Sequence, residues 1–82
     1  MDDEQKNYTL SYGSYNSILV INQSGIIKKV YTPFLVFKID LITSIKKVFV
    51  VDEVKTTKED KLVFVISQKA YYHSAFMLDI HF

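Results

Sequence analysis

The chain has 82 residues, and none of them is cysteine. This absence excludes disulfide bonds, thiolate-bound zinc or iron–sulfur clusters, and thiol catalysis. Only two glycines are present, Gly13 and Gly25, and neither lies in a glycine-rich motif that could cradle a phosphate. The sequence therefore carries no signature of a thiol enzyme or of a nucleotide-dependent one.

Arginine is missing too, so all ten basic residues are lysines. Bidentate recognition of guanine or phosphate depends on the guanidinium fork, so we do not expect sequence-specific reading of nucleic acid through such forks. Lysine can still contact phosphates without sequence preference. The net charge is +1, and three of the nine acidic residues stand at positions 2–4, which leaves a mildly basic body behind an acidic tip.

Long apolar runs are the third absence. No run approaches the ~18 residues of a transmembrane helix, so no membrane span is expected. The N-terminus is acidic and polar, unlike a secretory signal, and this favours a cytoplasmic location. Residues with AT-rich codons predominate, which points to a phage, a mobile element or a low-GC bacterium. A phage-encoded chain would act in the host cytoplasm.

Alternating segments in the first half of the chain predict β-strands. Residues 1–7 are polar and are expected to form a disordered tip, followed by a single β-rich domain over 8–82. In residues 8–12 large side chains at positions 8, 10 and 12 alternate with small polar ones at 9 and 11, which is the pattern of a half-buried strand, and Gly13 breaks this strand. An apolar strand at 18–21, a turn at 22–25 and a returning strand that ends at Pro33 predict a hairpin, with Gly25 supplying the positive φ of its turn.

The segment 34–46 fits two structures. Residues 34–37 are fully apolar, as in a buried strand, whereas Leu35, Ile39 and Ile42 would share one stripe of a helix. Asp40 could cap such a helix. We interpret residues 34–39 as a strand followed by a short helical segment near 40–46, and an α+β fold remains the alternative.

The second half predicts more strands. Residues 47–55 and 61–67 alternate around the polar loop 56–60, residues 68–70 form a turn, and residues 71–82 alternate to the end. The total is six to seven short strands with frequent turn signals. This spacing predicts a mainly β fold, a small SH3-like or related barrel or meander.

The second half also resembles small SH3-like barrel proteins of phages and prophages. In these proteins a strand beginning Lys-Val-aromatic leads to a polar loop, a strand ending in Val-Ile, an aromatic pair and a Ser-x-Phe. The matching residues here are Lys47, Val48, Phe49, Val51, Val54, Leu62, Phe64, Ile66, Tyr71, Tyr72, Ser74 and Phe76. The resemblance covers residues 46–80 and departs at Ile45-Lys46, where a glycine is usual. It implies a binding role and no catalytic residue.

No constellation of catalytic or metal-binding residues stands out. The two histidines, His73 and His81, are eight positions apart, a spacing that no compact metal motif uses. His73 and Ser74 are adjacent, so their side chains would point apart in a strand, away from the contact that nucleophilic catalysis requires. We therefore expect no enzyme, no cofactor and no metal site.

Two groups of residues are candidates for an interaction surface. The first is Tyr71, Tyr72 and His73, since tyrosine is enriched at interfaces and one of two adjacent tyrosines in a strand points outward. The second combines lysines with a tyrosine, a composition typical of barrels that bind single-stranded nucleic acid. Its members are Lys28, Lys29, Tyr31, Lys46 and Lys47.

The apolar content indicates a partner. Residues 26–27, 34–37 and 50–51 place apolar side chains on both faces of their strands, and one small core cannot bury both. The sequence thus predicts a non-enzymatic binding module that acts through protein–protein contacts, as a phage or mobile-element accessory protein that modulates a host protein or as a self-assembling one. A protein partner or a homo-oligomer is favoured over nucleic acid. The alternative is an oligonucleotide-binding small barrel that uses lysine and tyrosine.

Overall fold

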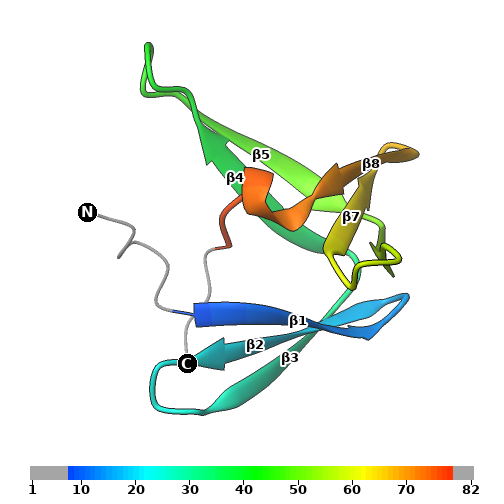
Figure 1. Cartoon of the computed structure of the whole chain (residues 1–82). Coiled ribbons are helices and arrows are strands. Elements are labelled where there is room, and N and C mark those ends of the chain that lie inside the picture. The colour runs from blue at the N-terminus through cyan, green and yellow to red at the C-terminus, as the bar shows by residue number, and fades with distance from the viewer. Residues whose placement is uncertain (1–7, 79–82) are drawn as a thin grey trace.

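A computed structural model of the chain describes residues 8–78, and this part is mainly β-structure (Figure 1). It contains eight strands in three antiparallel sheets and one short 3₁₀ turn. The prediction of a mainly β fold is confirmed, with eight strands where six to seven were expected. The predicted tip at 1–7 and the last four residues lie outside the described residues.

The first sheet joins β1 (Tyr8–Ser14), β2 (Ser17–Asn22) and β3 (Ile27–Tyr31) in that order. The predicted hairpin is β2–β3. Its turn is closed by the Asn22 side chain, whose Oδ1 accepts the N–H groups of Ser24 and Ile26, each at 2.9 Å. Gly25 has a φ of 84°, as the turn requires.

Gly13 does not end the first strand. The strand continues to Ser14 through a register shift opposite β2, so the glycine marks a β-bulge. A Cβ at position 13 would lie 2.6 Å from the Oγ of Ser17, which is fully buried and within 2.8 Å of the Ser14 Oγ. Glycine is needed here because the two strands approach closely, not because a turn begins.

The second sheet is a hairpin of β4 (Phe34–Ile39) and β5 (Lys46–Val51), which extends away from the first sheet (Figure 1). The strand predicted at 34–39 is confirmed. Residues 40–45 form the loop of this hairpin and not the short helical segment expected near 40–46. Asp40 explains the difference, because its N–H donates to the Ile45 carbonyl at 3.0 Å and so keeps the two strands paired up to the loop.

The third sheet joins β6 (Glu53–Thr56), β7 (Leu62–Ile66) and β8 (Lys69–Tyr72), and the 3₁₀ turn η2 (His73–Ala75) follows. The strand expected at 47–55 is divided at Asp52, whose neighbours pair with different sheets. The strand expected over 71–82 is interrupted by η2. Met77 then pairs with Phe37 through two backbone hydrogen bonds of 2.9 Å, which ties the end of the described chain to β4.

All three sheets contribute side chains to one core. Phe64 of β7 lies at its centre, with its ring 5.4 Å from that of Phe34 and 6.3 Å from that of Phe76. Ten buried residues make up this cluster: Ile18, Val20, Phe34, Val36, Val51, Val54, Leu62, Phe64, Ile66 and Phe76. Because each sheet has only two or three strands, its stability depends on this shared packing.

A comparison of two isoleucines, one buried and one exposed, tests which residues belong to the core. Ile18 is fully buried, whereas Ile27 is 59% exposed. We expect Ile18→Ala to lower the free energy of unfolding by ~2–5 kcal/mol, because it removes buried methyl groups and leaves a cavity. Ile27→Ala should change it by less than ~0.5 kcal/mol. Urea denaturation followed by circular dichroism measures both, and equal losses for the two variants would contradict the assigned core.

Candidate functional site

Tyr71, Tyr72 and His73 end β8 and begin η2. Tyr71 faces the core side, where its ring meets that of Phe76 edge-on at 5.9 Å. Tyr72 points the other way, as the alternation of a strand requires, and is the more exposed of the two tyrosines. Both tyrosines are thus exposed, Tyr72 more so than Tyr71, and they lie on opposite faces of β8.

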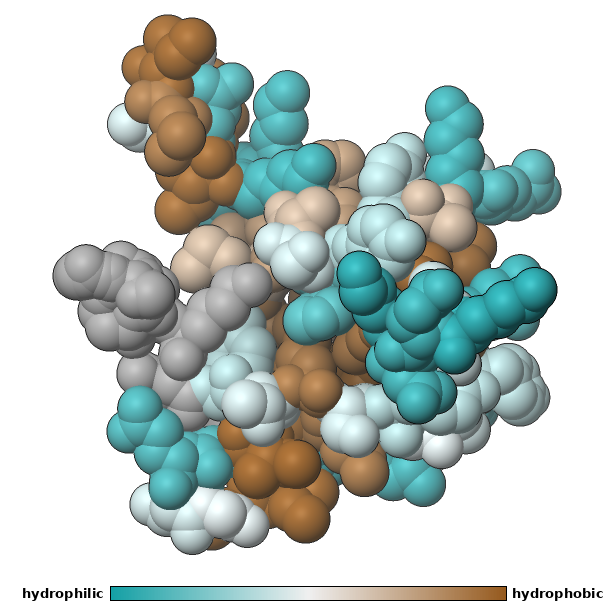
Figure 2. Space-filling model, in the orientation of Figure 1, coloured by the Kyte–Doolittle hydropathy of each residue, from teal (hydrophilic) through white to brown (hydrophobic). Residues whose placement is uncertain are grey.

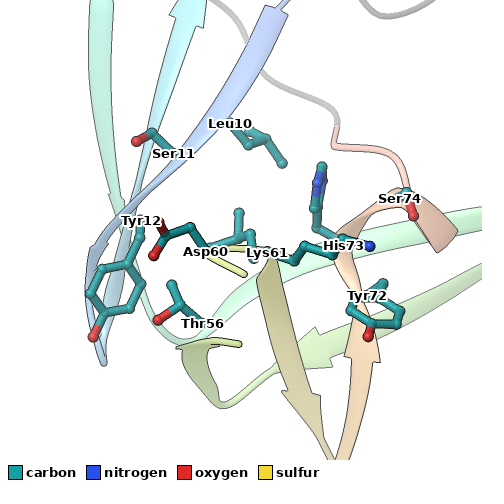
Figure 3. Close-up of a pocket in the computed structure, with 10 residues that line it drawn as sticks. Leu10, Ser11, Tyr12, Thr56, Asp60, Lys61, Tyr72, His73 and Ser74 are labelled. Atoms are coloured by element: carbon teal, nitrogen blue, oxygen red, sulfur yellow. The ribbon is translucent and has the colours of Figure 1, made fainter. Parts of the chain in front are cut away.

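Tyr72 and His73 border a cleft of about 730 Å³ between β1 and the third sheet (Figure 3). Tyr12 and Tyr72 stand at opposite ends of the view, and Asp60 and Lys61 lie between them. The ammonium group of Lys61 is 5.7 Å from the centre of the Tyr72 ring. The remaining lining residues are Leu10, Ser11, Thr56, Leu62 and Ser74.

The cleft mixes aromatic, hydroxyl and charged groups without a clear reaction centre. Within residues 8–78, no three histidine or acidic side chains come together where they could hold a metal ion. His73 lies against the core, with its ring 6.4 Å from that of Phe64. The walls offer aromatic rings for stacking and hydroxyl and charged groups for hydrogen bonding.

The lysines singled out from the sequence do not meet in one stripe. Lys28 and Lys29 are consecutive in β3 and point to opposite faces of the first sheet, and Lys29 lies 5.2 Å from the Tyr31 ring. Lys46 and Lys47 likewise point to opposite faces of β5, in another sheet. Figure 1 shows β3 at the bottom of the molecule and the loop end of the β4–β5 hairpin, where Lys46 and Lys47 begin β5, at the top.

The outer face of the β4–β5 hairpin is a surface that sequence reasoning located only in part. Directly opposed residues of antiparallel strands point to the same face, so Leu35, Val50, Phe37 and Val48 lie together on the side away from the core. Leu35 is 61% exposed and Val48 is 55% exposed. The surplus of apolar residues at 34–37 and 50–51 indicated this surface, whereas Val48 went unnoticed.

The tip of the same hairpin is more exposed still. Leu41 and Ile42 are 96% and 94% exposed, and Ile45 is exposed as well. In Figure 2 apolar residues cover the position where Figure 1 shows this loop, at the upper left. Sequence reasoning missed the tip because it placed residues 40–46 in a short helical segment and not in a projecting loop.

Asp40 holds the tip in shape. Its Oδ1 accepts the N–H of Ile42 at 2.8 Å and that of Thr43 at 3.0 Å. These backbone donors, first Thr43 and then Ile42, lower the pKa of the Asp40 carboxyl below its usual value of 3.8, and the charge of Lys47 adds to the effect. The carboxylate is thus a structural part of the loop.

No helix within the described residues is long and apolar enough to cross a bilayer.

Comparison with known proteins finds no match: no family model, no curated protein and no solved structure matches this chain.

Asp40 gives a prediction with a defined pH dependence. Its pKa is depressed in the folded state, so its stabilisation of the loop is present above the unfolded value and is lost as the pH falls through the folded one. Near neutral pH we expect the amide protons of Ile42 and Thr43 to exchange faster in Asp40→Ala. Asp40→Asn should be intermediate, since it keeps a neutral acceptor.

Amide exchange measured by NMR distinguishes these variants. Acidification well below pH 3.8 should reduce the difference between wild type and Asp40→Asn, because both then carry a neutral side chain at position 40. Equal exchange at Ile42 in wild type and Asp40→Ala at neutral pH would show that the carboxylate does not hold the loop.

Proposed function

We propose that this chain is a small non-enzymatic binding module that acts through protein–protein contacts. The observation that supports the proposal is the outer face of the β4–β5 hairpin, where apolar side chains are exposed on one side while the other side of the same strands packs in the core. A contiguous exposed apolar patch on a soluble domain typically marks an interaction surface. We include an origin in a phage or mobile element in this proposal. It is supported only by the excess of residues with AT-rich codons and by the resemblance to SH3-like barrel proteins.

The occupant that fits this face is a second copy of the chain. Leu35, Phe37, Val48 and Val50 carry no charge. The ammonium group of Lys46 lies 4.3 Å from the centre of the Phe37 ring, at the loop end of this face, where a lysine side chain can keep its charged end in water while two such faces pack against each other. In a two-fold arrangement with antiparallel hairpins, the loops of the two copies point in opposite directions. The lysines near each loop are then kept apart, which removes the main electrostatic cost of self-association.

The size of the face predicts a weak dimer. A six-residue strand is about 20 Å long, so the two strands expose only a narrow ribbon. Full burial of a Val or Leu side chain stabilises by ~1.5–3 kcal/mol, and these side chains are already partly buried. Association itself costs at least ~4 kcal/mol. We therefore expect dissociation constants in the micromolar range or weaker.

Sedimentation velocity over a concentration series tests self-association. Wild-type protein should shift from monomer to dimer towards high micromolar concentration. Val48→Thr with Val50→Thr should raise the dissociation constant at least ~10-fold, because four hydroxyl groups would be buried per dimer. Ile26→Thr with Ile27→Thr changes an equally exposed apolar pair elsewhere and should have no effect.

A strictly monomeric wild type at the highest concentration would overturn the proposal of a second copy. Concentration-dependent dimers that the Val48 and Val50 changes leave intact would show that another surface forms them.

An oligonucleotide-binding role is the second candidate, and the stacking of Lys29 over Tyr31 favours it. Its support is smaller, because the lysines of β3 and β5 lie in separate sheets. The role predicts binding to single-stranded DNA that weakens with salt, with a slope that Lys29→Gln reduces by ~0.7. Fluorescence anisotropy with a labelled oligonucleotide measures this, and a salt-independent signal would reject the role.

A further inference from the structure

The loop of the β4–β5 hairpin presents two apolar side chains almost completely to the surroundings. Leu41 and Ile42 are the most exposed large apolar residues of the described chain, and they lie at the end of an element that projects from the body (Figures 1 and 2). They lie beyond the outer face discussed above, on the loop itself. Such a tip is suited to insert its apolar side chains into the surface of a partner.

Lysines surround the base of this tip on both faces of the hairpin. Lys38 and Lys47 are directly opposed on the core-facing side, and Lys46 is opposite Ile39 on the outer side. Like charges that are directly opposed across two strands repel each other, and a negatively charged surface would relieve that repulsion. Asp40 is the only acidic residue between positions 38 and 47, and its carboxylate is engaged by the loop.

The arrangement of the lysines distinguishes between two kinds of partner. A protein that bound one side of the hairpin would be matched by lysines on that side alone. Here the positive charges flank both faces behind the tip, which matches a plane that lies across the axis of the hairpin. An anionic lipid surface has this geometry, with phosphates at the level of the lysines and acyl chains at the level of Leu41 and Ile42.

The backbone of the loop suits a surface that contains little water. The N–H of Asp40 donates to the Ile45 carbonyl, and that of Ser44 donates to the Asp40 carbonyl at 2.8 Å. The N–H groups of Ile42 and Thr43 donate to the Asp40 carboxylate, and that of Ile45 donates to the Thr43 Oγ1 at 3.3 Å. Polar groups that leave water without a partner are costly, so the pairing of these five N–H groups lowers the cost of placing the loop in a bilayer interface.

We propose that the tip of the β4–β5 hairpin inserts Leu41 and Ile42 into the interface of an anionic lipid bilayer, with Lys38, Lys46 and Lys47 at the headgroup phosphates. The attachment is peripheral and reversible. It combines a short apolar insertion with electrostatic attraction, and each contribution alone is too weak to hold the protein on a membrane. This inference goes beyond the protein–protein role and does not depend on it, because it uses different residues.

Co-sedimentation of the 82-residue chain with vesicles tests the proposal. Vesicles of phosphatidylcholine with phosphatidylserine should bind the protein, vesicles of phosphatidylcholine alone should bind it much less, and added salt should weaken binding. Leu41→Ser with Ile42→Ser should reduce the partition coefficient at least ~10-fold, and Lys46→Gln with Lys47→Gln should reduce it by a similar factor.

The matched control is Ile26→Ser with Ile27→Ser, an exposed apolar pair at the β2–β3 turn that should leave vesicle binding unchanged. Circular dichroism verifies that each variant is folded. No binding to anionic vesicles, or equal binding to both vesicle types, would overturn the proposal. Anionic binding that survives Leu41→Ser with Ile42→Ser would reduce it to surface adsorption and reject insertion.

Discussion

The three sheets depend on one shared core, in which Phe64 packs against Phe34 and Phe76 and the first sheet contributes Ile18 and Val20. Each of these rings comes from a different part of the chain, β7, β4 and the segment after η2, and they meet at centroid distances of 5.4 and 6.3 Å. A two- or three-stranded sheet is marginal by itself, so none of the three would persist without this cluster. Truncation of a buried Phe costs ~3–5 kcal/mol, which is a large part of the ~4–12 kcal/mol typical for a chain of 82 residues.

This dependence explains why the β4–β5 hairpin exposes so much apolar surface. Phe34, Val36 and Val51, near the base of the hairpin, fill the core, and further out Lys38 and Lys47 take over the same face. The hairpin is therefore anchored near its base. Beyond the pairing of Phe37 with Met77 and the contact of the Lys38 ammonium group with the Phe76 ring at 4.9 Å, the apolar side chains of its outer face and tip are exposed. Phe37 is partly protected by Lys46, whose ammonium group lies 4.3 Å from the ring centre. The element combines a fixed base with an uncovered face and an uncovered tip.

Turn chemistry decided how much of the fold could be predicted from the sequence. The β2–β3 hairpin was predictable because Asn22 and Gly25 mark its turn, and Gly25 takes a positive φ. The β7–β8 turn was placed a residue too late because Ser67 and Gln68 take positive φ values of 51° and 68° without the Asn or Gly that usually mark such a turn. The division at Asp52 was missed since alternation continues through it and does not reveal a change of sheet.

The alternation of a strand predicts which face a side chain points to, but it does not predict which strands lie next to each other, and this limited the prediction of the candidate surfaces. Consecutive lysines are adjacent in the sequence, but in a strand their side chains point to opposite faces of the sheet. Lys28 and Lys29 therefore cannot share one surface. The cleft beside Tyr72 depends on how β1 packs against the third sheet, a long-range contact that no local pattern encodes. The apolar surplus of the β4–β5 hairpin was visible because it is a matter of composition.

The loop of this hairpin shows why its apolar side chains call for a partner outside the chain. Asp40, Thr43 and Ser44 make the hydrogen bonds that shape the loop, and Ser44 takes the positive φ. The side chains of Leu41 and Ile42 take no part in this geometry and are almost fully exposed. Folding therefore gives no reason for apolar residues at these two positions, where polar ones would serve equally well. Because the hydrogen bonds already order the loop, docking it would cost little further conformational entropy, which is what a preformed binding element requires.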